Sequence, residues 1–205
     1  MGLVGSATVV DARTGRKLNN ALTLTFKTGA DQTIAVGAQV GSPWVLLGFK
    51  NTGDAGRCTL KGAGGDLALD CRTAVTTVTA VAGSAIGTIT RDGDDGFVRD
   101  GAGGLLARLV GLPKSHSRDP ICAYPLFDSA GAPLGTLSLL TTAATFDLLA
   151  EVVDTAIYWD MAAPLKVPTL GARLDLLHPV ESALGDLLLS TCMTIAIGPQ
   201  AFIEH

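Results

Sequence analysis

The segment GDLLLSTCMTIAIGP, residues 185–199, limits the fold more than any other part of the chain. Its dense apolar run, residues 187–197, is too short to span a membrane as a helix, which takes about 20 apolar residues. In a helix its three consecutive leucines point in directions about 100° apart, so no side of the helix is polar. Such a helix must be buried on every side, and we therefore predict a buried helix at about 179–197.

Residues that suit helix ends frame this segment. Pro179 fits the first turn, Glu181 lies at the positive end of the helix dipole, and Gly198–Pro199 ends the helix. Hydroxyl side chains inside the segment can donate to backbone carbonyls one turn back, which satisfies them in a buried helix. These residues are Ser190, Thr191 and Thr194. A strand is the alternative for the β-branched stretch MTIAI, residues 193–197.

Most of the remaining chain has the pattern of short β-strands separated by Gly and Asp turns. In ALTLTFKTG, residues 21–29, Leu and Phe alternate with Thr and Lys, which predicts a half-buried strand. Residues 71–91 are rich in Thr, Val and Ile, and Gly83 and Gly87 indicate bulges or a break into two strands. Residues 144–154 fit a helix and a strand almost equally well.

An internal repeat predicts β-hairpins. Residues 97–109, FVRDGAGGLLARL, align with residues 125–137, PLFDSAGAPLGTL, so that Asp100 matches Asp128 and a glycine follows three residues later in both. A weaker third copy is LKGAGGDLAL, residues 60–69. Each copy is an apolar strand, a turn in which glycine supplies positive φ, and a second apolar strand. A buried helix after many hairpins needs a sheet wrapped around it, and a closed barrel also removes the free strand edges.

This combination resembles the superfamily of tubby C-terminal domains, phospholipid scramblases and LURP-one-related plant proteins. The resemblance rests on the hairpins at 97–109 and 125–137, the strand AIGTITR at 85–91, and HPVESALGDLLLSTCMTIAIGPQAF at 178–202. It extends over about residues 20–203, and its motifs are degenerate. The resemblance implies a twelve-stranded barrel around a hydrophobic C-terminal helix. It also implies lipid-related activity, as phosphoinositide binding in tubby domains and membrane association in scramblases.

We therefore predict one mostly β domain over residues 1–205. A closed antiparallel β-barrel of about twelve strands, at about 20–177, would surround a buried hydrophobic C-terminal helix at about 179–197. The chain departs from the family in lacking a Lys/Arg phosphoinositide cluster and an acidic calcium-binding segment just before the last helix. The expected function is a non-catalytic module that binds a membrane lipid or a protein partner through its loops. The alternative is a structural or assembly subunit of a larger particle of the phage or secretion type.

Charge and composition limit the classes of partner that the protein is expected to bind. The 15 Lys and Arg residues are scattered singly against 19 Asp and Glu, for a net charge of −4, so nucleic-acid binding is disfavoured. The most polar loop, GLPKSHSRDP at 111–120, holds the basic pair Lys114 and Arg118. These two residues are the candidates for an anionic ligand. No transmembrane segment and no signal peptide is predicted, which indicates a cytoplasmic protein that is membrane-peripheral if it binds lipid.

Motifs for catalysis, metals or cofactors are sparse. The acidic stretch at 91–100 lacks the spacing and the distant Glu of a calcium loop, so a solvated hairpin turn is favoured. His116 has Ser and Asp neighbours in sequence, but a triad is spatial and no G-x-S-x-G motif exists. Neither GAGG stretch continues into a P-loop. We expect no catalytic residue, metal ligand or cofactor.

Two of the four cysteines flank a predicted hairpin. Cys58 and Cys71 lie almost symmetrically about TLKGAGGDLALD, and a turn at residues 63–66 would place them opposite each other across the ladder. They are either a bonded pair or two packed thiols in a reducing cytosol, and the packed thiols are favoured. No C-x-x-C motif or Cys/His cluster indicates zinc.

Overall fold

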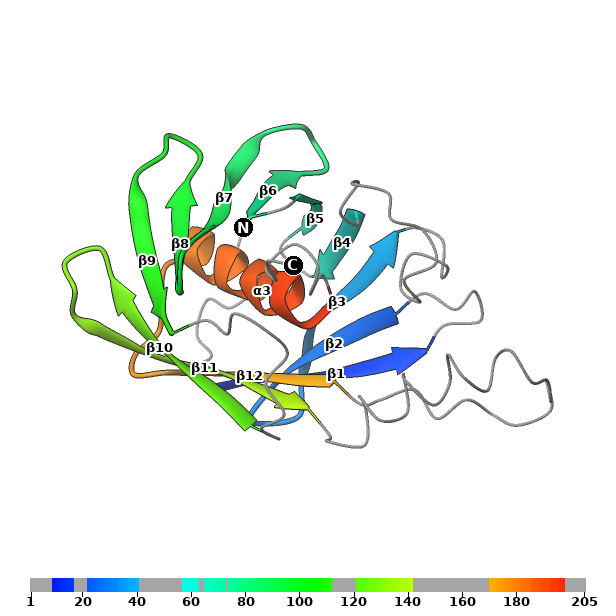
Figure 1. Cartoon of the computed structure of the whole chain (residues 1–205). Coiled ribbons are helices and arrows are strands. Elements are labelled where there is room, and N and C mark those ends of the chain that lie inside the picture. Colours follow the sequence, from blue (N-terminus) through cyan, green and yellow to red (C-terminus); the bar gives the residue numbers. More distant parts are fainter. Residues whose placement is uncertain are drawn as a thin grey trace, which may run out of the picture.

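A computed structural model of the chain describes residues 9–16, 22–40, 57–62, 65–72, 74–111, 121–141 and 170–197. Within these residues, twelve strands form one closed antiparallel barrel, and a C-terminal helix lies inside it (Figure 1). Each strand pairs with its neighbours in sequence, and β12 closes the barrel against β1. The predicted fold class is confirmed.

The wall elements follow one another along the chain. They are β1 (Val9–Arg16), β2 (Leu22–Thr28), β3 (Thr33–Val40), β4 (Arg57–Gly62), β5 (Gly65–Arg72), β6 (Val75–Ala80), β7 (Ala85–Asp92), β8 (Asp95–Asp100), β9 (Leu105–Val110), β10 (Ile121–Asp128), β11 (Pro133–Thr141) and β12 (Leu170–Leu176). The wall thus begins at Val9, before the boundary of about 20 that we expected. The helix is α3 (Ser182–Ile197), which starts after Pro179 and ends where predicted.

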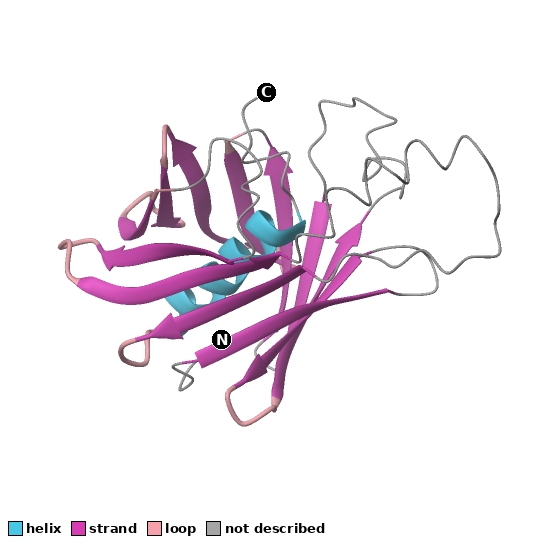
Figure 2. Ribbon diagram, turned by 60° about the horizontal axis from the view of Figure 1, so that its bottom comes forward, coloured by secondary structure: helices cyan, strands magenta, loops and turns pink. Residues whose placement is uncertain are grey.

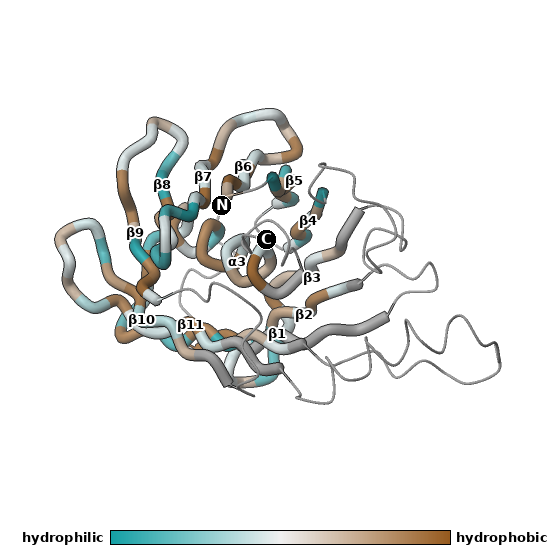
Figure 3. The backbone as a smooth tube through the Cα atoms, viewed as in Figure 1, coloured by the Kyte–Doolittle hydropathy of each residue, from teal (hydrophilic) through white to brown (hydrophobic). Residues whose placement is uncertain are grey.

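Period-two alternation places one side of each strand in the core. Leu24 and Phe26 of β2 are fully buried, as the pattern of residues 21–29 predicted. Figure 3 shows the same alternation as hydrophobic and hydrophilic bands along β4 and β5. Because the strands close on themselves, the inward side chains of all twelve converge on one core. That core includes the middle of α3.

The repeated hairpins close with the same five-residue turn. In β8–β9, the backbone N–H of Asp100 donates to the carbonyl of Gly104 (2.9 Å), and Gly103 takes φ 88°. The Asp100 side chain accepts hydrogen bonds from the N–H groups of Ala102 (2.9 Å) and Gly104 (2.8 Å). These side-chain bonds hold the turn in a conformation that the short Asp side chain favours. The β10–β11 turn repeats this geometry at Asp128.

Two further hairpins use this turn without the sequence signature. In β2–β3, Thr28 N–H donates to Gln32, and Asp31 takes positive φ in place of glycine. In β6–β7, the backbone N–H of Ala80 donates to the carbonyl oxygen of Ser84. The strand break predicted within residues 71–91 is this turn. All four hairpins show a register shift just before the turn, as expected for a β-bulge.

The predicted third copy, residues 60–69, forms the β4–β5 hairpin. Its register pairs Cys58 with Leu69, whereas the expected turn at residues 63–66 would have paired Cys58 with Cys71. The register therefore differs by two residues from the expected one. A shift of two leaves every side chain on its predicted face, because side chains alternate with period two.

The central helix is buried on every side along its middle, as its composition predicted (Figure 2). Leu187, Leu188 and Leu189 each have no exposed surface. The helix hydroxyls donate to carbonyls one turn back: Ser190 to Asp186 (2.8 Å), Thr191 to Leu187 (2.8 Å) and Thr194 to Ser190 (2.9 Å). The side-chain oxygens are thus satisfied without water. The strand alternative for residues 193–197 is wrong.

Glycines in the wall let the helix approach. A Cβ on Gly37 of β3 would overlap the thioether of Met193. A Cβ on Gly87 of β7 would overlap the Arg99 backbone oxygen and lie 3.0 Å from the Leu187 side chain. Gly87 is therefore a packing position inside β7, and the strand break lies before it, at residues 81–84. Close packing of this kind sets how the helix sits in the barrel.

Candidate functional site

The two ends of the barrel differ in how the strands are connected. Because neighbouring strands are antiparallel, connections alternate between the ends. At one end, called the turn end here, the chain passes from β4 to β5 and from β12 into α3, and the described hairpin turns there are at residues 28–32, 80–84, 100–104 and 128–132. At the other end, called the connection end, the chain passes from β5 to β6, and the described hairpin turn is at 92–95.

The predicted anionic-ligand residues lie between β9 and β10 in the sequence. Lys114, Arg118 and His116 lie in residues 112–120, outside the described residues. The strands that this segment joins, β9 and β10, end and begin there at Val110 and Ile121. The assignment of Lys114 and Arg118 stays a prediction. The helix or strand expected at 144–154 also lies outside the described residues.

The acidic stretch forms a solvated hairpin turn, as predicted. Asp92 pairs with Asp95 across the tight β7–β8 turn, and Gly93 supplies positive φ. The Asp95 carboxylate forms an ion pair with Arg108 of β9. Among the described residues, no group of three or more His, Cys, Asp or Glu side chains is arranged to hold a metal ion.

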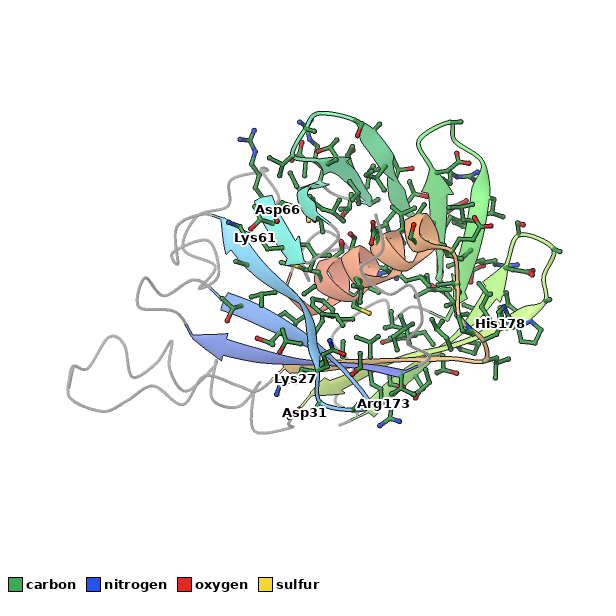
Figure 4. The ribbon with its side chains drawn as sticks, turned by 180° about the vertical axis from the view of Figure 1, so that it is seen from behind. Lys27, Asp31, Lys61, Asp66, Arg173 and His178 are labelled. Carbon is green, nitrogen blue, oxygen red and sulfur yellow. The ribbon has the colours of Figure 1, made fainter. Side chains whose placement is uncertain are left out.

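The charged side chains of the turn end are arranged in local pairs. Lys27 lies 2.9 Å from Asp31, and Lys61 lies 3.9 Å from Asp66 (Figure 4). The Lys27 ammonium, by its hydrogen bond and its charge, lowers the pKa of Asp31. His178 is exposed where the chain leaves β12 for the helix (Figure 4). Exposed pairs such as these contribute little to binding or stability.

Outward side chains of β8, β9 and β10 form an aromatic and cationic row. The register places Phe97 opposite Arg108, and Arg108 opposite Phe127. The guanidinium carbons of Arg99 and Arg108 each lie 5.9 Å from the centre of the Phe97 ring, within the range of a cation–π contact. Sequence reasoning missed this row, because it arises only when three strands are aligned.

A cluster of buried thiols and hydroxyls lies between the wall and the helix near the connection end. Cys58, Cys71 and Cys192 are free and buried. Cys58 and Cys71 face inward from β4 and β5, but the register pairs Cys58 with Leu69, so the two cysteines are diagonal neighbours and not directly opposed. Each thiol is near enough to shift the pKa of the other. The structure therefore has two packed, unbonded thiols at Cys58 and Cys71, which is the favoured one of the two predicted states.

The two thiols of this pair have different acidities. The hydrogen bond with Cys71, together with burial, raises the pKa of Cys58 well above its usual range. The hydrogen bond from Cys58, with smaller contributions from the hydroxyls of Thr76 and Thr194, lowers the pKa of Cys71 despite its burial. The two thiols therefore titrate as a coupled pair, in which loss of one proton disfavours loss of the second.

The hydroxyl neighbours come from elements that are distant in sequence. Thr76 is on β6, next to Cys71 in the ladder, and Thr194 is on the last turns of α3. No signal in the sequence linked either residue to the cysteines, since only barrel closure around the helix brings them together. Cys192 lies two residues before Thr194 on the same helix, so its side chain points to a nearly opposite side, and burial raises its pKa to about 12.

Comparisons with known proteins leave the family open. No family model, no curated protein and no solved structure matches this chain. The described part of the chain contains no helix with the length and apolar character needed to cross a membrane.

Proposed function

We propose that this protein is a non-catalytic binding module of the tubby and scramblase-like type that contacts a lipid or a protein partner through its loops. The observation that carries this proposal is that the barrel encloses its own helix, whose residues from Leu187 to Thr194 are buried. A barrel filled by side chains leaves its outer surface and its loops for binding.

The segment at 111–120 has the composition best suited to an anionic head group. Lys114 and Arg118 supply two cations in a polar stretch, and both side chains bind phosphate oxygens well. Each basic residue near an anionic membrane surface contributes about 1 kcal/mol, so two support a weak and salt-sensitive association. A cytoplasmic protein with this property would attach to the membrane peripherally.

Co-sedimentation with liposomes tests this function. The native protein is expected to pellet with liposomes that contain phosphatidylserine or phosphoinositide, and not with phosphatidylcholine alone. The Lys114→Glu/Arg118→Glu variant should stay in the supernatant. The matched control, Lys27→Glu/Lys61→Glu, changes the net charge equally at the turn end and should still pellet. If the native protein does not pellet, or if the loop variant pellets equally, the lipid version is wrong.

A structural or assembly subunit is the second candidate, supported by the outer wall of β6 and β7. The middle of this surface is formed by threonines: Thr77, Thr79, Thr88 and Thr90. An uncharged β surface suits packing between copies, since the centres of interfaces are depleted of charge. Light scattering should then show assembly as concentration rises, and Thr77→Lys/Thr88→Lys should suppress it. A monodisperse native monomer at high concentration would exclude this candidate.

A further inference from the structure

The thiol pair lies near one end of the barrel. Cys58 is the second residue of β4 and Cys71 is the second-last residue of β5, both at the connection end. Their sequence neighbours Arg57 and Arg72 are exposed. The two sulfur atoms therefore lie in the first inward-facing layer at this end, although neither residue is more than 2% exposed.

The offset between the two cysteines favours an atom between the sulfurs over a direct bond. Diagonal neighbours on antiparallel strands have Cα atoms about 7–8 Å apart, whereas a disulfide usually needs about 4.4–6.8 Å. The β4–β5 register is continuous from Arg57 to Gly62, so it does not allow the two positions to move closer. The side chains nevertheless point to the same inward face of the barrel, as diagonal neighbours on adjacent strands.

An independent observation comes from Thr76. This residue is completely buried, and within the described residues its Oγ1 has no conventional hydrogen-bond partner, although the hydroxyl lies beside the Cys71 sulfur. An unused hydroxyl in an apolar core is costly unless something in the site uses it. A sulfur that carries negative charge would accept this proton, so the hydroxyl is placed to support a thiolate.

We propose that Cys58 and Cys71 form a two-coordinate binding site for a soft monovalent cation, copper(I) or silver(I), with Thr76 supporting the ligating sulfurs. Thiolate sulfur selects ions of this class. Each coordinating thiol releases its proton to solvent as the cation binds, and no atom changes oxidation state. The bound ion would join β4 and β5. The site is independent of the lipid-binding proposal.

Competition with a chromogenic copper(I) chelator under anaerobic, reducing conditions tests the site. The native protein is expected to remove one copper(I) ion per chain from the chelator, and its thermal unfolding temperature should rise, because the ion binds only the folded state. Cys58→Ala and Cys71→Ala should each lose this binding, and circular dichroism checks that each variant folds. Silver(I) titration, followed by the same unfolding shift, gives a second readout that does not depend on copper chemistry.

The control variants change the other two cysteines and the hydroxyl group of Thr76. Cys192→Ala and Cys122→Ala should keep the single copper(I) ion. Thr76→Val should keep the stoichiometry but bind roughly tenfold more weakly, as loss of a supporting group around a metal does, and Thr76→Ser should restore the affinity.

Two results would overturn the proposal. One is a native protein that does not compete with the chelator, or one whose binding survives Cys58→Ala. The other is rapid formation of a Cys58–Cys71 disulfide when the folded protein meets oxidised glutathione, because it would show that the offset does not keep the sulfurs apart.

Discussion

The barrel wall and the helix inside it are specified in different ways. In the wall, the β8–β9 and β10–β11 hairpins carry their turn chemistry within five residues, at Asp100 and Asp128. The helix α3 has polar side chains that are satisfied internally and apolar ones on all sides, so its folding depends on a closed wall. Changes on the helix should therefore affect the whole molecule, and changes in a turn should affect one hairpin.

The largest effect is expected for Leu188→Asp, which places an unpaired carboxylate in the centre of the barrel. Leu188 has no exposed surface, and such a change typically costs more than about 4 kcal/mol. The variant should not fold cooperatively, as judged by circular dichroism and thermal unfolding. Leu177→Asp, at a residue that is 68% exposed, is the matched control and should fold normally. A soluble, cooperative Leu188→Asp protein would contradict a central helix.

The contact between wall and helix can be tested with two glycines. Gly87→Ala should cost about 1–3 kcal/mol, because the new methyl group meets the backbone oxygen of Arg99, which cannot move away easily. Gly37→Ala should cost less, because its methyl group meets the flexible thioether of Met193. Denaturant unfolding measures both. Gly29→Ala, where the nearest atom is 3.8 Å away, is the control. An equal or larger loss for Gly37→Ala would mean that the Met193 side chain cannot move away from the new methyl group.

An alkaline pH dependence is expected from the helix thiol. Burial raises the pKa of Cys192 from 9.0 to about 12, so the folded protein keeps this proton after the unfolded chain has lost it. The resulting stability is complete below pH 9 and declines between pH 9 and about 12, with a loss of about 1 kcal/mol by pH 10. Urea unfolding of the native protein and of Cys192→Ala should therefore converge as the pH rises over this range. Parallel curves would show that Cys192 ionises in the folded state as easily as in the unfolded one.

The smallest effect belongs to the turns. Asp128→Ala removes the side-chain hydrogen bonds to the N–H groups of Ala130 and Ala132, and should cost about 1 kcal/mol. Asp128→Asn keeps an acceptor oxygen and should lose less. Ser129→Ala, at an exposed position in the same turn, is the control. Chemical unfolding provides the comparison. A cost for Asp128→Ala close to that for Gly87→Ala would remove the distinction between wall and helix.

Sequence patterns predicted the elements that carry their own signal. The helix followed from its length and its apolar circumference, and the two hairpins followed from the matching Asp100 and Asp128 turns. The turn at 28–32 was missed because Asp31 replaces glycine there, and the turn at 80–84, which no Asp opens, was predicted only as a bulge or a break near Gly83. The β4–β5 register was misplaced by two residues because its Gly-rich stretch permits either turn position.

For the thiol pair too, local sequence patterns predicted only the contacts between residues that are near each other in the chain. The face shared by Cys58 and Cys71 could be derived from alternation along the chain, since a hairpin relates nearby residues. The hydroxyls of Thr76 and Thr194 could not, because one comes from the next strand and the other from a helix that is more than a hundred residues away in the chain.

By itself, the sequence predicted a closed sheet around a buried helix, because an apolar helix with no polar side has to be covered all round and most of the remaining chain has the pattern of strands. Only the tertiary structure decided which strands meet, which glycines receive the helix and which hydroxyls meet the thiols. These contacts depend on register and closure, in which small differences in packing between distant segments select one arrangement among several that local patterns allow.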